Sequence, residues 1–73
     1  MTTSTFAVCV RNPGYEASLE LRKIYEVLPD ELARQHHRRR VVDESGEAYL
    51  YPEEFFIDIK LPASLVVYFT AAA

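Results

Sequence analysis

The stretch from Asp43 to Ile59, DESGEAYLYPEEFFIDI, decides the fold because it contains several structural signals in a fixed order. Its polar start predicts a hairpin turn over residues 44–47, since the glycine there can adopt the positive φ that such turns need. Residues 48–51 favour a short aromatic strand. The proline that follows presets the φ of a first helical position, so residues 52–55 favour a single tight turn. This order is typical of a small barrel.

The end of this stretch alternates between apolar and polar side chains. A period of two residues indicates a strand with one face in the core and the other in solvent. We therefore expect Phe55, Ile57 and Ile59 to lie in the core. Asp58 and Lys60 should face solvent.

The earlier part of the chain predicts three more strands and a short helix. Residues 15–21 predict an irregular connecting loop. Residues 30–36 begin with acidic and end with basic side chains, which predicts one or two helical turns. So short a helix needs tertiary support, which we expect from Leu32 and Ala33. The predicted strands are residues 6–10, 23–28 and 39–43.

The apolar segment LVVYF, residues 65–69, also favours a strand. Such a segment would be an aggregation hazard if it were exposed. We expect it to be buried, either as a strand that closes the sheet or in a dimer interface. Residues 63–73 form a C-terminal extension in this interpretation, residues 1–4 a loose N-terminus, and residues 1–73 together a single domain.

The composition indicates a globular protein with no strong electrostatic preference for nucleic acid. Of its 73 residues 49% are hydrophobic and 26% charged, and the net charge is −3. Cys9 is the only cysteine, which excludes an internal disulfide and favours a buried small side chain. The sequence shows neither a signal peptide nor the run of about 20 apolar residues that a membrane span needs. We therefore expect a protein of the reducing cytoplasm.

Residues 49–56, YLYPEEFF, resemble the segment Gly-aromatic/aliphatic-Pro-x-x-Tyr-Val of SH3 domains. In that family the proline opens a 3₁₀ turn between the last two strands. Pro52 would take this place, and Phe55 that of the tyrosine. The resemblance implies an all-β fold: a small SH3-like barrel of about five strands with one short helical turn.

The resemblance does not imply the peptide binding of eukaryotic SH3 domains. Those domains hold proline-rich peptides against a tryptophan and the tyrosines of an Ala-Leu-Tyr-Asp-Tyr motif, and this chain has neither. The segments KIYEVLPDE, RVVDESGE and YLYP also make the chain similar to small uncharacterised single-domain bacterial proteins. That similarity implies a stand-alone barrel and no particular activity.

The tyrosines are the candidate binding residues. Tyr49 and Tyr51 share one face of their predicted strand, with Leu50 on the other. If Leu50 lies in the core, the two tyrosines form an exposed pair; otherwise they cover the open end of the barrel. Because tyrosine is enriched at binding surfaces, we expect Tyr49, Tyr51 and Tyr15 to contact a protein partner.

A dense charge run, HHRRR at residues 36–40, offers an alternative site. Arg38, Arg39 and Arg40 would contact phosphates if the protein binds nucleic acid. Alternation along a strand puts Arg39 opposite the other two. Because the net charge is −3, a solvated surface whose arginines pair with nearby acids is the favoured interpretation.

The remaining polar residues predict no enzyme, cofactor or metal site. Adjacent histidines diverge on helices and strands, and the chain has no glycine-rich phosphate loop or nucleophile elbow. The sequence therefore predicts a non-catalytic module that binds a protein. The alternative is a small nucleic-acid-associated barrel that uses the three arginines. No membrane partner is expected, and the choice between monomer and dimer is open.

Overall fold

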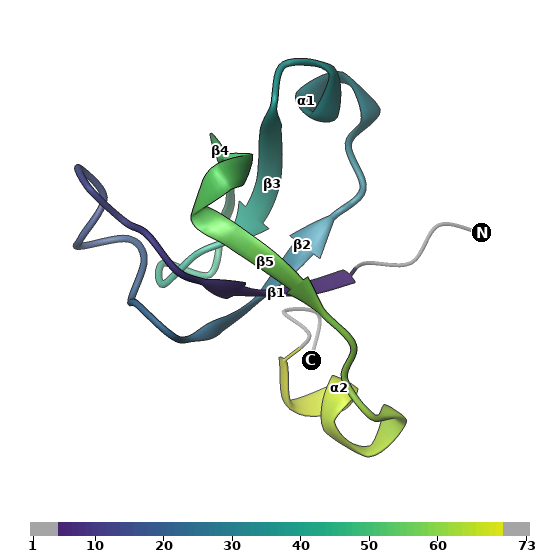
Figure 1. The fold of residues 1–73 in the computed structure, drawn as a ribbon. Helices are drawn as coiled ribbons and strands as arrows, with labels where there is room; N and C mark the ends of the chain where they lie inside the picture. Colours follow the sequence, from purple (N-terminus) through teal and green to yellow (C-terminus); the bar gives the residue numbers. More distant parts are fainter. Residues whose placement is uncertain (1–4, 70–73) are drawn as a thin grey trace.

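The computed structural model describes residues 5–69, which form one antiparallel sheet of five short strands (Figure 1). Their sheet order is β4-β3-β2-β1-β5, so β1 and β5 are the only neighbours that are not consecutive in the chain. The strands are β1 (Thr5–Cys9), β2 (Ile24–Leu28), β3 (Arg38–Val42), β4 (Ala48–Pro52) and β5 (Phe56–Ile59).

The predicted all-β class, with about five strands and a short helical turn, is confirmed. β4 and β5 form the two edges, and within residues 5–69 they do not pair with each other. Hydrogen bonds therefore leave the sheet open rather than closing it into a barrel. The SH3 likeness stays a prediction, and the expectation for residues 1–4 lies outside the described residues.

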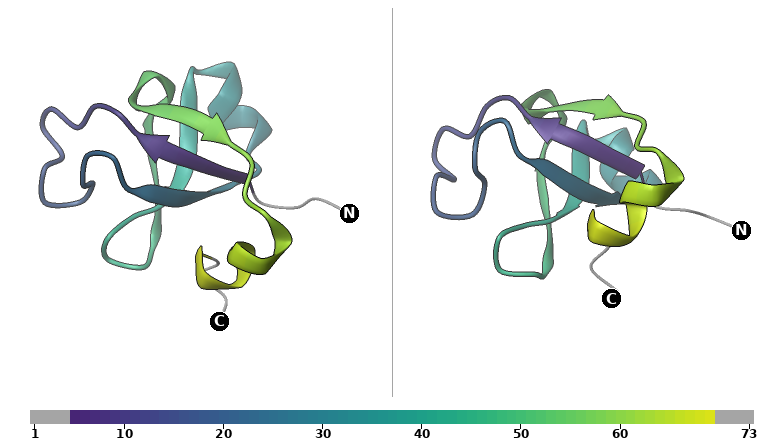
Figure 2. Two further views of the ribbon diagram at one scale, coloured as in Figure 1. Left: turned by 60° about the horizontal axis from the view of Figure 1, so that its bottom comes forward. Right: turned by 90° about the horizontal axis from the view of Figure 1, so that it is seen from below.

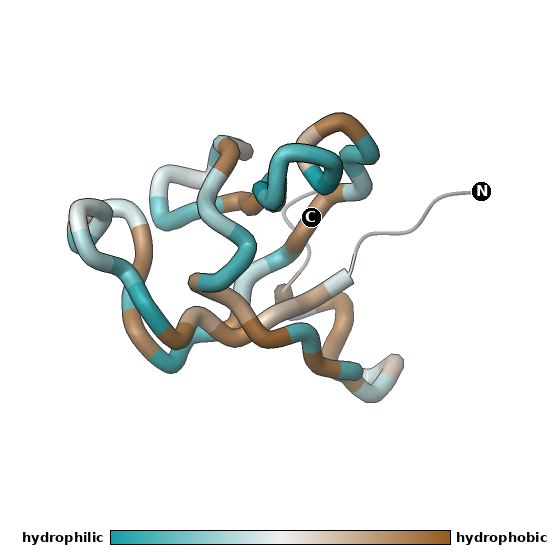
Figure 3. The backbone as a smooth tube through the Cα atoms, turned by 45° about the horizontal axis from the view of Figure 1, so that its top comes forward, coloured by the Kyte–Doolittle hydropathy of each residue, from teal (hydrophilic) through white to brown (hydrophobic). Residues whose placement is uncertain are grey.

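Most of the core lies on one face of the curled sheet, which we call the inner face, although Phe6 on the other face is also buried. Strand alternation sends Ala7 and Cys9 of β1 to the inner face and Phe6 and Val8 to the opposite, outer face. Figure 3 shows hydrophobic and hydrophilic stretches interspersed along the backbone. The buried inner cluster consists of Ala7, Cys9, Leu19, Tyr25, Val27, Val41, Tyr51, Phe55 and Phe56.

The phase of β5 differs from the prediction. Phe55 is buried, but it ends the 3₁₀ turn η1 (Glu53–Phe55), and the strand begins with the equally buried Phe56. Alternation then turns Ile57 outward, where 60% of it is exposed, and Ile59 is only half-buried. The prediction of Ile57 as a core residue is therefore wrong. Asp58 and Lys60 are exposed, as predicted.

Helix α1 (Glu31–Gln35) forms where the charge pattern predicted it. Asp30 caps it, because its Oδ1 accepts a hydrogen bond of 3.0 Å from the N–H of Ala33. Of the two residues expected to support the helix, Ala33 is buried, but Leu32 is 70% exposed and that prediction is wrong. Ala33 is the only buried residue of this five-residue helix.

The predicted loop and hairpin are both present. The chain between β1 and β2 runs through turns without regular structure and buries Leu19 completely. Gly46 adopts a φ of +83° in the β3–β4 hairpin, and its N–H donates to the carbonyl of Asp43 at 2.9 Å. The proline-led turn forms as η1, with Pro52 at its N-cap.

The C-terminal segment is a helix, α2 (Ala63–Phe69), and not the predicted strand. It begins directly after Pro62, and it lies next to β2 (Figure 2). Within residues 5–69 this segment pairs with no strand, and β4 and β5 remain the edges of the sheet. None of the helix residues is buried within the chain, and Val67 and Tyr68 are 68% and 78% exposed. The predicted closing strand is wrong; burial against a second chain stays a prediction.

Candidate functional site

The three candidate tyrosines converge on one open hollow of about 510 Å³ at the surface. Tyr15 comes from the β1–β2 loop, whereas Tyr49 and Tyr51 come from the edge strand β4. We call this surface the tyrosine hollow, and its lining residues are Tyr15, Ser18, Asp43, Ser45, Tyr49, Leu50 and Tyr51.

The tyrosines differ in their roles. Tyr51 is only 3% exposed and belongs to the core, whereas Tyr15, Tyr49 and Leu50 are 39%, 51% and 41% exposed. The sequence predicted that Tyr49 and Tyr51 would form an exposed pair if Leu50 lay in the core. Leu50 is not in the core, and the two tyrosines do not form an exposed pair. The Tyr15 ring instead stands edge-on to the Tyr51 ring, with centroids 5.1 Å apart at 84°. Tyr51 thus supports a surface that Tyr15, Tyr49 and Leu50 present.

A buried carboxylate lies at the base of the hollow. Asp43 is 7% exposed and accepts hydrogen bonds from the Tyr51 hydroxyl at 2.5 Å, the Ser45 hydroxyl at 2.5 Å and the Ser45 N–H at 2.8 Å. Burial alone would raise the pKa of Asp43, but the hydrogen bonds from Ser45 and Tyr51 outweigh it and lower this pKa. Burial, followed by the bond to Asp43, raises the pKa of Tyr51 to about 12. The base of the hollow therefore carries a negative charge at neutral pH.

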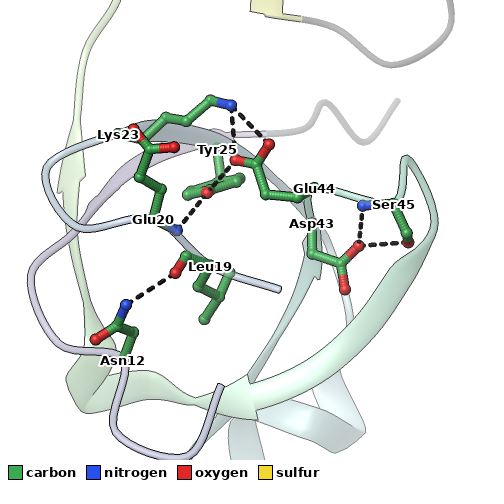
Figure 4. Close-up of polar contacts among 8 residues, drawn as sticks. All are labelled: Asn12, Leu19, Glu20, Lys23, Tyr25, Asp43, Glu44 and Ser45. Carbon is green, nitrogen blue, oxygen red and sulfur yellow. Dashed lines mark hydrogen bonds and ion pairs between the residues drawn. The ribbon is translucent and has the colours of Figure 1, made fainter. Parts of the chain in front are cut away.

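The loop that supplies Tyr15 is fixed to the β3–β4 hairpin by a second polar group (Figure 4). The Tyr25 hydroxyl accepts a bond of 2.7 Å from the N–H of Glu20 and donates to the Glu44 carboxylate. Lys23 completes the group with an ion pair of 2.6 Å to Glu44. The pKa of Glu44 is lowered, mainly by its contact with Lys23 and secondly by its bond from Tyr25. The pKa of Tyr25 is raised, mainly by burial and secondly by its bond to Glu44.

Two further bonds hold the middle of this loop. The side-chain amide of Asn12 donates to the carbonyl of Leu19 at 2.9 Å (Figure 4), and the N–H of Glu44 donates to the carbonyl of Ser18 at 3.1 Å. Leu19 is fully buried between them. Tyr15 is therefore carried by a loop that is anchored at several points before any ligand binds.

The structure separates the three candidate arginines. Arg39 pairs with Asp58 at 2.9 Å, and Arg40 pairs with Asp30 at 2.7 Å. Arg38 is exposed and has no ion pair within the described part of the chain. Alternation on β3 puts Arg39 on the face opposite the other two, as predicted. Two of the three positive charges are thus balanced locally.

Within residues 5–69 the other polar residues do not gather into a metal site, and the cysteine is not placed for reaction. No group of three His, Cys, Asp or Glu residues that could hold a metal occurs among residues 5–69. Cys9 is fully buried, and burial raises the pKa of its thiol, so it is not an activated nucleophile. Within the same residues no helix has the length and apolar character to cross a membrane.

Sequence reasoning missed Asp43 and Ser45 as part of the site. Their signal was the order Asp-x-Ser-Gly, because a carboxylate two residues before a turn serine commonly accepts its N–H and hydroxyl bonds. The contact of Tyr15 with Tyr51 had no local signal, because it depends on how the loop docks.

No protein-family model, curated protein or solved structure matches the chain.

Proposed function

We propose that this protein is a non-catalytic binding module that holds a segment of another protein in the tyrosine hollow. The observation that supports this most directly is the exposure of Tyr15, Tyr49 and Leu50 around one hollow. Large side chains with apolar area and a polar tip are typical anchors of protein interfaces. The SH3-like architecture is part of the same proposal, since a proline-led 3₁₀ turn does connect the last two strands.

The anchoring of the loop supports this function. The bonds from Asn12, Tyr25 and Glu44 fix the chain on both sides of Leu19. Tyr51 in turn holds the ring of Tyr15 in an edge-on contact. A surface that is already ordered loses less conformational entropy when a ligand binds, and this favours affinity.

The charges around the hollow favour a partner segment with a lysine or arginine. No basic residue is among its lining residues, whereas Asp43 lies at its base. The Tyr49 hydroxyl donates to the Glu47 carboxylate at 3.3 Å, and the negative charge of Glu47 raises the pKa of Tyr49. A cationic side chain could lie on the face of Tyr15 or Tyr49 while its charge stays near these carboxylates.

The nucleic-acid alternative has weaker support. Asp58 and Asp30 balance two of the three candidate arginines, and the net charge of the chain is −3. The reducing cytoplasm remains the proposed location, because the buried thiol of Cys9 suits a compartment without disulfide chemistry.

A peptide selection tests the proposal. A displayed library of random peptides is selected on the full chain, and the enriched peptides are titrated by NMR. We expect saturable shifts at Tyr15, Tyr49 and Leu50, and weaker binding at higher salt if the peptide carries a positive charge.

Matched variants localise the binding. Tyr49→Ser should weaken binding by at least about tenfold, as loss of an interface anchor does. Tyr68→Ser is the control, because Tyr68 is 78% exposed on α2 and does not line the hollow. Enriched peptides that bind Tyr49→Ser and the unchanged protein equally well would contradict the assignment.

A further inference from the structure

The outer edge of β5 is a second candidate interaction surface, separate from the tyrosine hollow. β5 is the last strand of the sheet, and within residues 5–69 only β1 pairs with it. Its residues Ile57 and Asp58 are exposed, and so is Lys60 just after it. An edge strand with free backbone groups can pair with a strand of another chain.

The register with β1 determines which backbone groups face this edge. In antiparallel pairs the residues that bond to the partner alternate with residues whose N–H and C=O point away. The N–H of Val10 donates to the carbonyl of Phe55 at 2.7 Å, so Ile57 and Ile59 also direct their backbone groups to β1. The backbone groups of Asp58 and Lys60 therefore point to the outer edge.

This edge is complementary to itself in one antiparallel register. When Asp58 of one chain lies opposite Lys60 of a second copy, the outward N–H and C=O groups of both residues can bond. The same register places each Asp58 carboxylate, which also pairs with Arg39 of its own chain at 2.9 Å, opposite an ammonium group, and Ile59 opposite its own copy. A shift by two residues in either direction would instead oppose Asp58 to Asp58 or Lys60 to Lys60, which is unfavourable.

The side chains on the outer face agree with this register. Ile57 would lie opposite Leu61 of the second copy, next to the central pair of Ile59 residues. Ile57 is 60% exposed in the single chain, and Ile59 and Leu61 are half-buried. Lys60 and Leu61 lie outside any helix, so they can continue the strand.

From these observations we infer that two copies of this chain associate through antiparallel pairing of their β5 edges. The partner is a second copy because the alternating order of Ile57, Asp58, Ile59, Lys60 and Leu61 matches itself in charge and in apolar contact. The two sheets then form one continuous sheet across a twofold axis. The tyrosine hollow lies on β4, at the opposite edge, and would remain accessible.

Sedimentation equilibrium tests the pairing. The unchanged chain should sediment with twice its mass of 8.4 kDa. Ile57→Lys should raise the dissociation constant by at least about tenfold, because it puts a charge into the apolar part of the edge. Circular dichroism should show that this variant remains folded, since Ile57 is mostly exposed.

Val67→Lys is the matched control, because Val67 is 68% exposed but lies on α2. It should leave the dimer unchanged. In the dimer the amide protons of Asp58 and Lys60 should also exchange slowly and lose this protection on dilution. A chain that is monomeric at concentrations of about 1 mM would overturn the inference. A dimer that survives Ile57→Lys, or that Val67→Lys dissociates, would overturn it too.

Discussion

Replacing Tyr51 by phenylalanine removes one hydroxyl from the base of the tyrosine hollow and keeps the ring in the core. The lost group donates a bond of 2.5 Å to Asp43, whose carboxylate is buried and keeps only its bonds from Ser45. Hydrogen bonds to charged groups contribute about 1.5–3 kcal/mol. With about 4–8 °C per kcal/mol for a domain of this size, we expect Tm to fall by about 10 °C.

The pH dependence identifies the carboxylate as the source. The folded state lowers the pKa of Asp43, so its contribution is present above the unfolded value of about 3.9 and is lost as the pH falls through the folded value. The difference between Tyr51→Phe and the unchanged protein should therefore shrink as the pH falls from 7 towards 2. Urea unfolding followed by circular dichroism measures it at each pH.

Tyr49→Phe is the control, since its hydroxyl is exposed and bonds to Glu47 at the longer distance of 3.3 Å. It should change the free energy of unfolding by less than about 0.5 kcal/mol. The reasoning is refuted if Tyr51→Phe unfolds at the same urea concentration as the unchanged protein at pH 7. A difference that stays constant down to acid pH would show that the ionised carboxylate is not involved.

Two further predictions concern stability. Ile57→Ala should lower the free energy of unfolding by less than about 1 kcal/mol, because Ile57 is mostly exposed. Val41→Ala, at a fully buried position, should lower it by about 2 kcal/mol or more in the same urea titration. Equal losses would show that Ile57 belongs to the core. Tyr25 and Tyr51 have raised pKa values, so their contribution is complete below the unfolded value of about 10 and is lost as the pH rises towards 12. Tm should therefore fall between pH 10 and 12, and a flat profile across this range would contradict the burial of the two phenols.

Local chemistry made several elements predictable from the sequence. The hairpin depends on a glycine in a turn, α1 on the Asp30 cap, and η1 on a proline at its start. The phase of β5 was not predictable in the same way. Two phenylalanines follow each other, and only the length of η1 determines that Phe55 ends the turn and Phe56 begins the strand.

Tertiary structure decides the remaining elements. The β-branched residues of the C-terminal segment favour a strand locally, yet the segment forms α2 next to β2 and leaves the edge strands β4 and β5 unextended. The tyrosine hollow could be predicted only in its residue types. Its geometry depends on the docking of the β1–β2 loop, which brings Tyr15 against Tyr51 through contacts between residues distant in the sequence.

The pairing of β1 with β5 has a consequence for how the chain folds. Phe6 pairs with Ile59, so the first and last strands in the chain, β1 and β5, must meet. The pairs β2–β3 and β3–β4 instead join strands that are consecutive in the sequence. The meander from β2 to β4 closes short loops and can form early, but joining β1 to β5 closes the longest loop. During synthesis β5 must leave the ribosome before the sheet is complete. The sheet therefore acquires its final stability only after β5 has been translated.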